Sequence, residues 1–366
     1  MKIKVLKEKL LTGLQTVQNI VSNKITLPIL SNILLEAKNG KLRLCATDLD
    51  IGISCEYPVD ILEEGAITIP AKKVTDIVRE MPSGEILIYT QRNNQIEIEC
   101  DRCRFKLNGL PKDEFPKFPE VKDKERITIE QTVLKEMLDM TYFAVSYEES
   151  RYVLNGVLFE ISGKIMCTVA ADGRRLAKME KEILSPIEDD IKVIIPIKAV
   201  QEILRNLNDE GDVFMIIGNN QVLFDINSVL ITTRIIEGEF PNYQQAIPPP
   251  SENKIKIKTN DLLSAIRRAN LLSTTDFQAV KFEVFSNKMV ISKNTPNIGE
   301  SREEIPIENN GPKIVVGYSP NFFIDVLKHI TREYIDLELV SMEGNSIIRA
   351  VIRLDGYLYL VMPMSI

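Results

Sequence analysis

The sequence lacks the residues and motifs on which most enzyme active sites depend. It has a single histidine, His329, and the motifs G-x-x-x-x-G-K-[ST], G-x-G-x-x-G, H-E-x-x-H and G-x-S-x-G are all missing. Carboxylate pairs such as Asp48 with Asp50 could hold a metal in principle, but acidic residues at turns are usually only solvated. We therefore expect no catalytic residue, no metal and no cofactor. His329 is interpreted as a surface or helix-end side chain.

Cysteine is scarce and odd in number. Five residues cannot all pair into disulfides, which favours free thiols and a reducing compartment. Cys100 and Cys103 have the C-x-x-C spacing, but no second pair accompanies them and the only histidine is distant in sequence. Chance spacing is therefore preferred over a zinc or redox site.

Long apolar runs are also missing. The apolar stretch at 357–364 is too short to span a bilayer, and the first residues, M-K-I-K-V-L-K-E-K-L, lead into no signal-peptide core. These features predict a cytoplasmic protein. The net charge of −7 argues at first sight against nucleic acid as a partner.

What the chain does contain is one pattern of helices and strands, repeated three times with a period of about 125 residues. The clearest match joins 69–81 to 195–207, where a proline precedes an amphipathic helix, and the third copy begins at Ser319-Pro320. Each copy opens with a second amphipathic helix and continues into strands joined by Asn- or Gly-containing turns. The predicted fold is α+β, with three similar domains at 1–120, 126–247 and 253–366. Each has two helices packed on antiparallel sheets.

Four segments resemble the bacterial DNA polymerase III beta subunits, the sliding clamp family. They are 26–32 (T-L-P-I-L-S-N), 151–160 (R-Y-V-L-N-G-V-L-F-E), 172–177 (D-G-R-R-L-A) and 359–364 (Y-L-V-M-P-M), and together they span all three repeats. The resemblance implies a homodimer closed head to tail into a ring of six clamp domains. Such a ring encircles double-stranded DNA without reading its sequence. It tethers the replicative polymerase, the clamp loader and repair proteins through short peptide motifs, and it catalyses nothing itself.

The resemblance also answers the objection from charge, because a ring needs positive potential only on the surface that faces DNA. In the family, the helices expected here at 6–19, 71–81, 131–142, 197–207, 260–272 and 320–331 line the hole. Their charges sum to +3, which leaves −10 for the rest of the chain. The implied DNA contacts are Lys72, Lys73, Arg79, Lys198, Arg205, Arg267 and Arg268, together with Lys24, Arg151 and Tyr152. From the residues alone, solvated helix faces would be the simpler interpretation.

The family's partner-binding groove corresponds here to Leu154, Gly173, Arg174, Arg175, Leu176, Pro241, Ser346, Leu360, Met362, Pro363 and Met364. Leucine and methionine can form a soft apolar groove that repacks around different peptides. Without the resemblance, Leu360 and Met362 could simply be the buried face of a last strand. The chain departs from the commoner family pattern at Ala171, Arg174, Gln245 and Ser365, which leaves the peptide preference open.

Ring closure in the family joins the first domain of one chain to the third domain of the next. Phe105, Leu271 and Leu272 match its apolar contacts, and edge strands pair across the same interface. Sequence alone would place these three side chains in the core. Two alternatives from other classes are a repeat-built adaptor that never touches DNA and a metal-dependent nuclease or hydrolase.

Overall fold

The computed structural model describes residues 1–21, 27–118, 126–341 and 347–366. The chain forms two compact units, each taken separately below: residues 1–134 with 198–235, and residues 135–197 with 236–366. Helices and antiparallel sheets occur in both, so the predicted α+β class is confirmed. Two predicted site residues, Lys24 and Ser346, lie outside the described residues.

The first unit contains two sheets, ordered β5-β1-β7-β8-β9 and β10-β15-β16-β17-β4-β3-β2-β6. Strand β17 belongs to the second repeat but pairs with β4 of the first. The elements of this unit are β1 (Lys2–Leu6), α1 (Lys7–Gln18), η1 (Pro28–Ser31), β2 (Asn32–Lys38), β3 (Lys41–Thr47), β4 (Ile51–Pro58), β5 (Asp60–Glu63), β6 (Gly65–Pro70), α2 (Ala71–Glu80), β7 (Glu85–Thr90), η2 (Arg92–Asn94), β8 (Gln95–Cys100), β9 (Cys103–Asn108), η3 (Lys112–Glu114), β10 (Arg126–Glu130), α4 (Ile197–Asn206), β15 (Asp212–Ile217), β16 (Gln221–Ile226) and β17 (Val229–Arg234).

The second unit contains one sheet, ordered β14-β11-β12-β13-β25-β24-β23-β18-β21-β20-β19-β22. Here β25, from the third repeat, pairs with β13 of the second. The elements are α3 (Gln131–Asp139, which begins in the first unit), η4 (Tyr142–Ala144), η5 (Glu149–Leu154), β11 (Gly156–Ser162), β12 (Ile165–Ala171), β13 (Arg175–Glu182), β14 (Ile191–Pro196), η6 (Tyr243–Ala246), β18 (Lys254–Lys258), α5 (Thr259–Asn270), β19 (Val280–Val284), β20 (Lys288–Thr295), β21 (Gly299–Asn309), β22 (Ile314–Tyr318), α6 (Pro320–Leu327), β23 (Tyr334–Ser341), β24 (Ile348–Leu354) and β25 (Tyr357–Val361).

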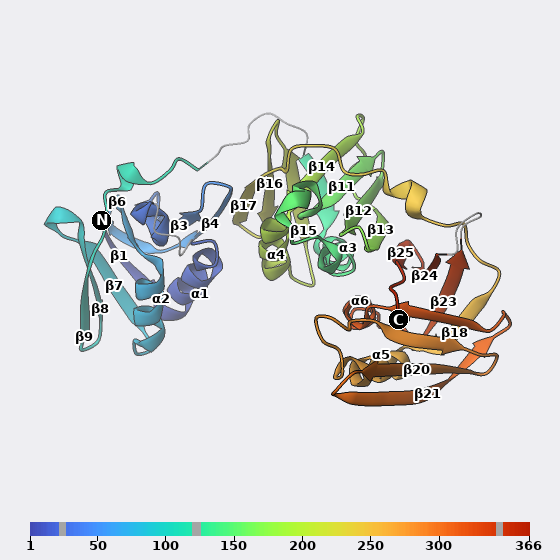
Figure 1. Cartoon of the computed structure of the whole chain (residues 1–366). Coiled ribbons are helices and arrows are strands. Elements are labelled where there is room, and N and C mark those ends of the chain that lie inside the picture. The colour runs from blue at the N-terminus through green and yellow to red at the C-terminus, as the bar shows by residue number, and fades with distance from the viewer. Residues whose placement is uncertain (22–26, 119–125, 342–346) are drawn as a thin grey trace. The chain divides into compact units, whose positions relative to one another are not determined.

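The helices form where apolar residues recur on one face. In α2, Val74 and Val78 are buried, Pro70 occupies the N-cap, and the N–H of Met81 donates to the carbonyl of Ile77 at the helix end. Figure 1 shows α1 beside α2, and α5 packs in the same way against α6. Each repeat contains two helices, as predicted.

Several minor sequence features have structural explanations. Cys100 and Cys103 face each other across the tight turn between β8 and β9, and all five cysteines are free. Within the described residues, no three His, Cys, Asp or Glu side chains are arranged to hold a metal ion. No described helix combines the length and apolar character that a membrane span requires. His329 lies just beyond the end of α6, where its ring stacks on Phe143 with centroids 5.3 Å apart.

Candidate functional site

The turn between β12 and β13 is held by one carboxylate. Oδ1 of Asp172 accepts hydrogen bonds from the backbone N–H groups of Arg174 (2.8 Å) and Arg175 (2.9 Å). Gly173 has a φ of +88°, and a Cβ at this position would lie 2.4 Å from Nη1 of Arg151. The backbone angle therefore favours glycine here, and an added Cβ would also require the exposed Arg151 side chain to move.

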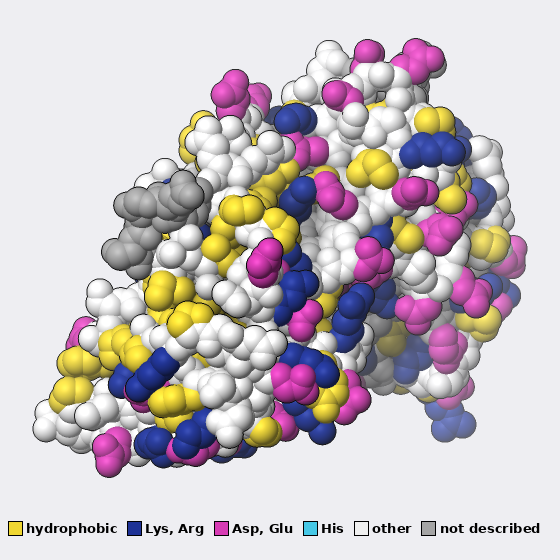
Figure 2. Space-filling model, turned by 90° about the vertical axis from the view of Figure 1, so that its right-hand side faces the viewer, with side chains coloured by type: hydrophobic (Ala, Val, Ile, Leu, Met, Phe, Trp, Pro, Cys, Tyr) yellow, Lys and Arg dark blue, Asp and Glu magenta, His cyan; other side chains and the backbone are white. Residues whose placement is uncertain are grey.

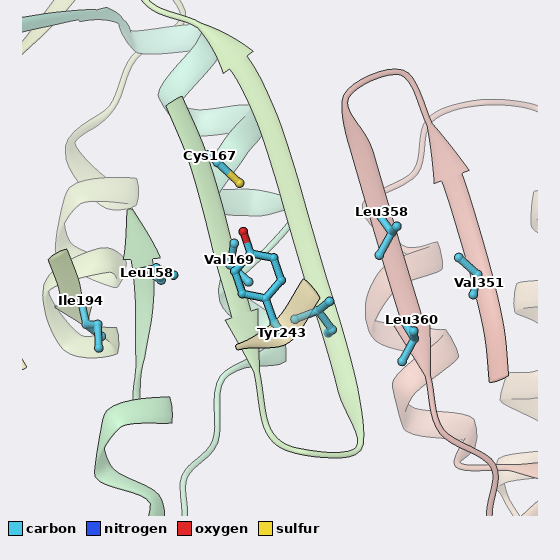
Figure 3. Packing of buried hydrophobic residues seen from close by; sticks show 9 residues of the cluster. Leu158, Cys167, Val169, Ile194, Tyr243, Val351, Leu358 and Leu360 are labelled. Atoms are coloured by element: carbon cyan, nitrogen blue, oxygen red, sulfur yellow. The ribbon is translucent and has the colours of Figure 1, made fainter. Parts of the chain in front are cut away.

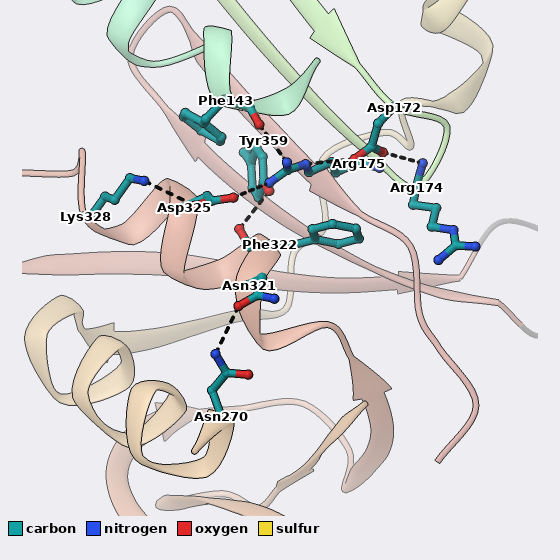
Figure 4. A network of polar contacts seen from close by, with 10 residues as sticks. All are labelled: Phe143, Asp172, Arg174, Arg175, Asn270, Asn321, Phe322, Asp325, Lys328 and Tyr359. Atoms are coloured by element: carbon teal, nitrogen blue, oxygen red, sulfur yellow. Dashed lines mark hydrogen bonds and ion pairs between the residues drawn. The ribbon is translucent and has the colours of Figure 1, made fainter. Parts of the chain in front are cut away.

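The Arg175 side chain is buried and fully engaged within the chain (Figure 4). Its Nε donates to Oδ2 of Asp172 (3.0 Å), and its Nη1 donates to Oδ2 of Asp325 on α6 (2.7 Å). Its Nη2 donates to the carbonyl oxygen of Phe143 (2.6 Å), and the guanidinium lies 4.6 Å from the ring centre of Phe322. Arg175 therefore fixes the start of β13 against η4 and α6, and all three of its nitrogens already have partners.

Next to this turn, β25 continues the sheet with apolar side chains. Leu176 pairs with Leu360, and the N–H of Met362 donates to the carbonyl of Arg174 (2.8 Å). Met362 and Val153 pack at the margin of the buried side chains and are themselves only partly buried. The apolar layer thus ends at side chains that solvent reaches. Its buried members, shown in Figure 3 and called the groove cluster below, are Leu158, Cys167, Val169, Leu176, Ile194, Tyr243, Val351, Leu358 and Leu360.

Tyr243 joins the groove cluster to a charged pair. Its hydroxyl donates to Oε2 of Glu160 (2.5 Å), whose other carboxylate oxygen is 2.7 Å from Nζ of Lys192. Burial disfavours the charged form of Glu160, but the hydrogen bonds from Lys192 and Tyr243 outweigh it and lower the pKa of that carboxyl below its ordinary value. Because the polar end of Tyr243 is satisfied, its ring can stay in the apolar layer.

The structure places the predicted groove residues at different depths. Leu176, Leu360 and Met362 come together in or beside the groove cluster, and Val153 of η5 packs against it. The end of the chain is held where the N–H of Met364 donates to the carbonyl of Gly317 (2.8 Å). Among the described groove residues, Leu154, Arg175, Leu176 and Leu360 are buried, Met362, Pro363 and Met364 are partly buried, and Gly173, Arg174 and Pro241 are exposed.

The predicted DNA contacts differ in whether an acidic side chain pairs with them. All those in the described residues are exposed, but only Lys72, Lys73 and Arg267 form no ion pair with another described residue. On the face shown in Figure 2, basic and acidic side chains are likewise interspersed. The paired candidates are Arg79 with Asp76, Arg151 with Glu148, Lys198 with Asp48, Arg205 with Glu202, and Arg268 with Glu303. Tyr152 is also exposed.

The residues predicted at the dimer interface are not in the core of the single chain. Leu271 is 82% exposed and Phe105 is 40% exposed, while Leu272 is partly buried. The expectation from sequence alone, that these side chains are core residues, is therefore wrong. Phe105 lies on β9, which is an edge strand of its sheet, so one row of backbone groups has no strand partner among the described residues.

Comparison with known protein families shows which family the chain belongs to. Models of the DNA polymerase III beta subunit match it end to end: the N-terminal domain at 1–119, the central domain at 128–242 and the C-terminal domain at 244–365. The chain belongs to the DNA polymerase III beta subunit family. It is a sliding clamp, the non-catalytic processivity factor of DNA polymerase III, and the family implies DNA and a DNA polymerase as its partners. The adaptor and hydrolase alternatives are thereby set aside.

Individual beta subunits resemble this chain over its whole length. The beta sliding clamp of Escherichia coli K12 is 31% identical over 369 residues, which cover 100% of both chains. The crystal structure of the Bacillus subtilis sliding clamp matches with a TM-score of 0.94 and 29% identity, covering 100% of this chain and 99% of that one. The C. crescentus clamp, crystallised with polyethylene glycol at its proposed beta-motif tethering region, matches with a TM-score of 0.91 and 28% identity, covering 100% of both chains.

Sequence reasoning missed the residues that hold Arg175 at the turn between β12 and β13 of this beta subunit. Asp325, Phe322 and the carbonyl of Phe143 hold Arg175, yet Asp325 is 150 residues away from it in sequence. No local pattern marks such a partner. A partial signal existed for the turn itself, because Asp48 begins an equivalent turn one repeat earlier.

Proposed function

We propose that this clamp receives partner proteins through the groove cluster and its exposed margin. Short peptide segments of the polymerase, the clamp loader and repair proteins lie across Leu176, Leu360 and Met362. The observation that carries the proposal is that a continuous buried apolar layer ends in the partly exposed chain-end residues Met362 to Met364. The tethering region reported for the C. crescentus clamp supports a peptide-binding role in the same family.

In this proposal Arg175 positions the groove instead of touching the peptide. All three of its guanidinium nitrogens are used by Asp172, Asp325 and Phe143. Arg174 is different, because its side chain is exposed while its backbone carbonyl accepts a hydrogen bond from the N–H of Met362. Arg174 can therefore reach a polar group on a bound peptide without disturbing the fold.

We further infer that two chains close head to tail into a cytoplasmic ring around double-stranded DNA. The exposed apolar side chains of Phe105 and Leu271 and the open edge of β9 support closure, since a monomer rarely leaves such features uncovered. Within the hole, Lys72, Lys73 and Arg267 are the strongest candidates for phosphate contacts because no described acidic side chain neutralises them. The domains of the ring run over 1–120, 126–247 and 253–366, close to the family matches.

The groove is tested with Met362→Glu, which introduces a charge at the margin of an apolar layer. A fluorescein-labelled peptide copied from the clamp-contacting segment of the organism's replicative polymerase serves as the probe in anisotropy measurements. Because an unpaired buried charge costs several kcal/mol, affinity should fall by about 100-fold or more. The matched control is Leu184→Glu, at an apolar side chain that is 50% exposed and lies outside the cluster.

The same samples test ring closure independently. Sedimentation should show a dimer for the wild type and for both variants, and all three should stay on nicked circular DNA after loading but slide off linear DNA. Near-original peptide affinity in Met362→Glu would refute the groove. Equal loss from circular and linear DNA would refute encirclement while leaving the groove untouched.

A further inference from the structure

Arg349 is a buried cation with two guanidinium nitrogens that have no acceptor among the described residues. It lies on β24 with 9% of its surface exposed, and its Nε and Nη1 are buried without a hydrogen-bond partner among the described residues. Arginine stays charged at any physiological pH, and an unsatisfied buried donor is costly. Such a group in a native structure therefore calls for an acceptor supplied from elsewhere.

The strand register places Arg349 beside the groove. Side chains alternate along a strand, so Arg349 shares a face with Val351, which pairs with Leu360 and belongs to the groove cluster. Ala350 pairs with Val361, so the next positions along the two strands bring Arg349 opposite Met362, at the partly exposed end of the cluster. The orphaned guanidinium is thus at the margin where a peptide would lie.

The neighbouring charged side chains on this face already have hydrogen-bond partners within the chain. Arg353, two residues further along β24, donates through Nε to Oε2 of Glu338 (3.3 Å) and through Nη2 to the carbonyl of Pro248 (2.6 Å). Oε2 of Glu338 also accepts from the N–H of Ser251 (3.1 Å). Two arginines on one face of one strand therefore differ: Nε and Nη2 of Arg353 have acceptors within the chain, whereas Nε and Nη1 of Arg349 have none among the described residues.

We propose that Arg349 is the carboxylate-recognising residue of the partner groove. The inference rests on the proposed peptide groove and specifies the chemistry of its occupant: an apolar peptide that carries a carboxylate, from an Asp or Glu side chain or from its own C-terminus. The planar guanidinium presents several donors to such a group at once. A bound carboxylate then supplies the acceptor that Arg349 lacks.

The test varies one charge on the peptide and one on the protein. The polymerase-segment probe is made in matched forms in which each Asp or Glu is replaced singly by Asn or Gln, each with a free or an amidated C-terminus. Against wild-type protein, the form that has lost the recognised carboxylate should bind about 10-fold more weakly, as expected for a hydrogen bond to a charged group. Whichever change weakens binding, in the side chain or at the terminus, identifies the source of the carboxylate.

Arg349→Gln should bind the charged and uncharged forms equally, and Arg349→Lys should restore part of the difference. Arg92→Gln, an exposed change of the same charge in the first unit, should keep the full wild-type discrimination. Equal binding of all peptide forms by the wild type would overturn the proposal, as would discrimination that survives in Arg349→Gln. If instead no form binds the wild type, the groove itself fails. Because the peptide series uses unmodified protein, instability of a variant does not prevent a decision.

Discussion

At two places, called joints below, a strand of one repeat pairs with a strand of the next. The two joints have the same backbone arrangement but different side chains. At the first joint β17 pairs with β4, and at the second β25 pairs with β13. Each begins with an aspartate turn, in which Asp48 accepts from the N–H groups of Asp50 and Ile51 much as Asp172 does at the second joint. Each also has the same closing hydrogen bond of 2.8 Å, from the N–H of Arg234 to the carbonyl of Asp50 at the first joint.

The side chains decide what each joint can do. Where the second joint has Leu176 opposite Leu360, the first has Gly52 opposite Thr232, and a Cβ on Gly52 would lie 2.9 Å from the ring of Phe118. The first joint is thus filled by the chain's own aromatic ring. Its remaining hollow, of about 330 Å³, is lined largely by polar residues such as Asp50 and Gln221. The two joints therefore share a backbone arrangement, but only the second carries a cluster of apolar side chains that reaches a partly exposed margin.

The largest effect should come from the charge that holds the second joint. Arg175→Met would leave Asp325 and the carbonyl of Phe143 without the donor they share. The free energy of unfolding should therefore fall by about 3 to 5 kcal/mol. At the equivalent position of the first joint, Ile51→Val should cost only about 0.5 to 1.5 kcal/mol. Urea denaturation followed by circular dichroism measures both. Similar losses at the two positions would contradict the distinction between the joints.

Exchanging glycine and a larger residue at the two turns should change the stability of the chain in opposite directions. Leu49 has a φ of +82° where the second turn has glycine, so Leu49→Gly should stabilise the chain by about 0.5 to 1 kcal/mol by relieving left-handed strain. Gly173→Ala should destabilise it by about 1 to 3 kcal/mol, through the same strain and the contact with Arg151.

The control for this exchange is Gly163→Ala. Gly163 also has a positive φ, of +55°, but a Cβ there would meet nothing within 4 Å. Its loss of stability should therefore be smaller than that of Gly173→Ala, because its φ lies in the ordinary left-handed region and its Cβ would meet no other atom. Thermal midpoints suffice for the comparison, and a destabilised Leu49→Gly would show that the leucine side chain outweighs the strain.

The smallest effect should be a pH dependence of the free energy of unfolding that arises from His329 near the second joint. Burial, reinforced by Lys328, lowers the pKa of His329 below its ordinary value, although Asp139 and Asp325 act in the opposite direction. The unfolded chain then binds a proton more readily than the folded one, so stability falls as pH drops below about 6.5. His329→Phe should flatten this fall, with Lys328→Gln as a charge control.

The histidine can be followed directly, because it is the only one in the chain. A titration of its ring protons by nuclear magnetic resonance should give a midpoint below about 6.5. A midpoint above that value would mean that the two carboxylates, and not burial, dominate its surroundings.

Much of the fold could be predicted because its signals are local. The helix beginning after Pro70 shows its buried face as Val74 and Val78, and the same spacing after Pro196 and Pro320 revealed the repeat. The groove cluster and its margin were partly predictable, since Leu360 and Met362 lie in one apolar segment near the chain end. The support of Arg175 by Asp325 was not predictable, because the two residues are 150 positions apart in sequence.

By itself, the sequence determined the threefold repeat, the phase of its helices, the lack of recognised catalytic motifs and the apolar chain end. Only the tertiary structure decided which charges are neutralised: Lys198 is paired with Asp48 of another repeat, whereas Lys72 has no described acidic partner. It also decided that Leu271 is exposed instead of buried, and that Arg175 is satisfied while Arg349 is not. The physical reason is the same in each case. Propensity and periodicity act between residues a few positions apart, but an ion pair or a buried donor depends on groups that only the folded chain brings within hydrogen-bonding distance.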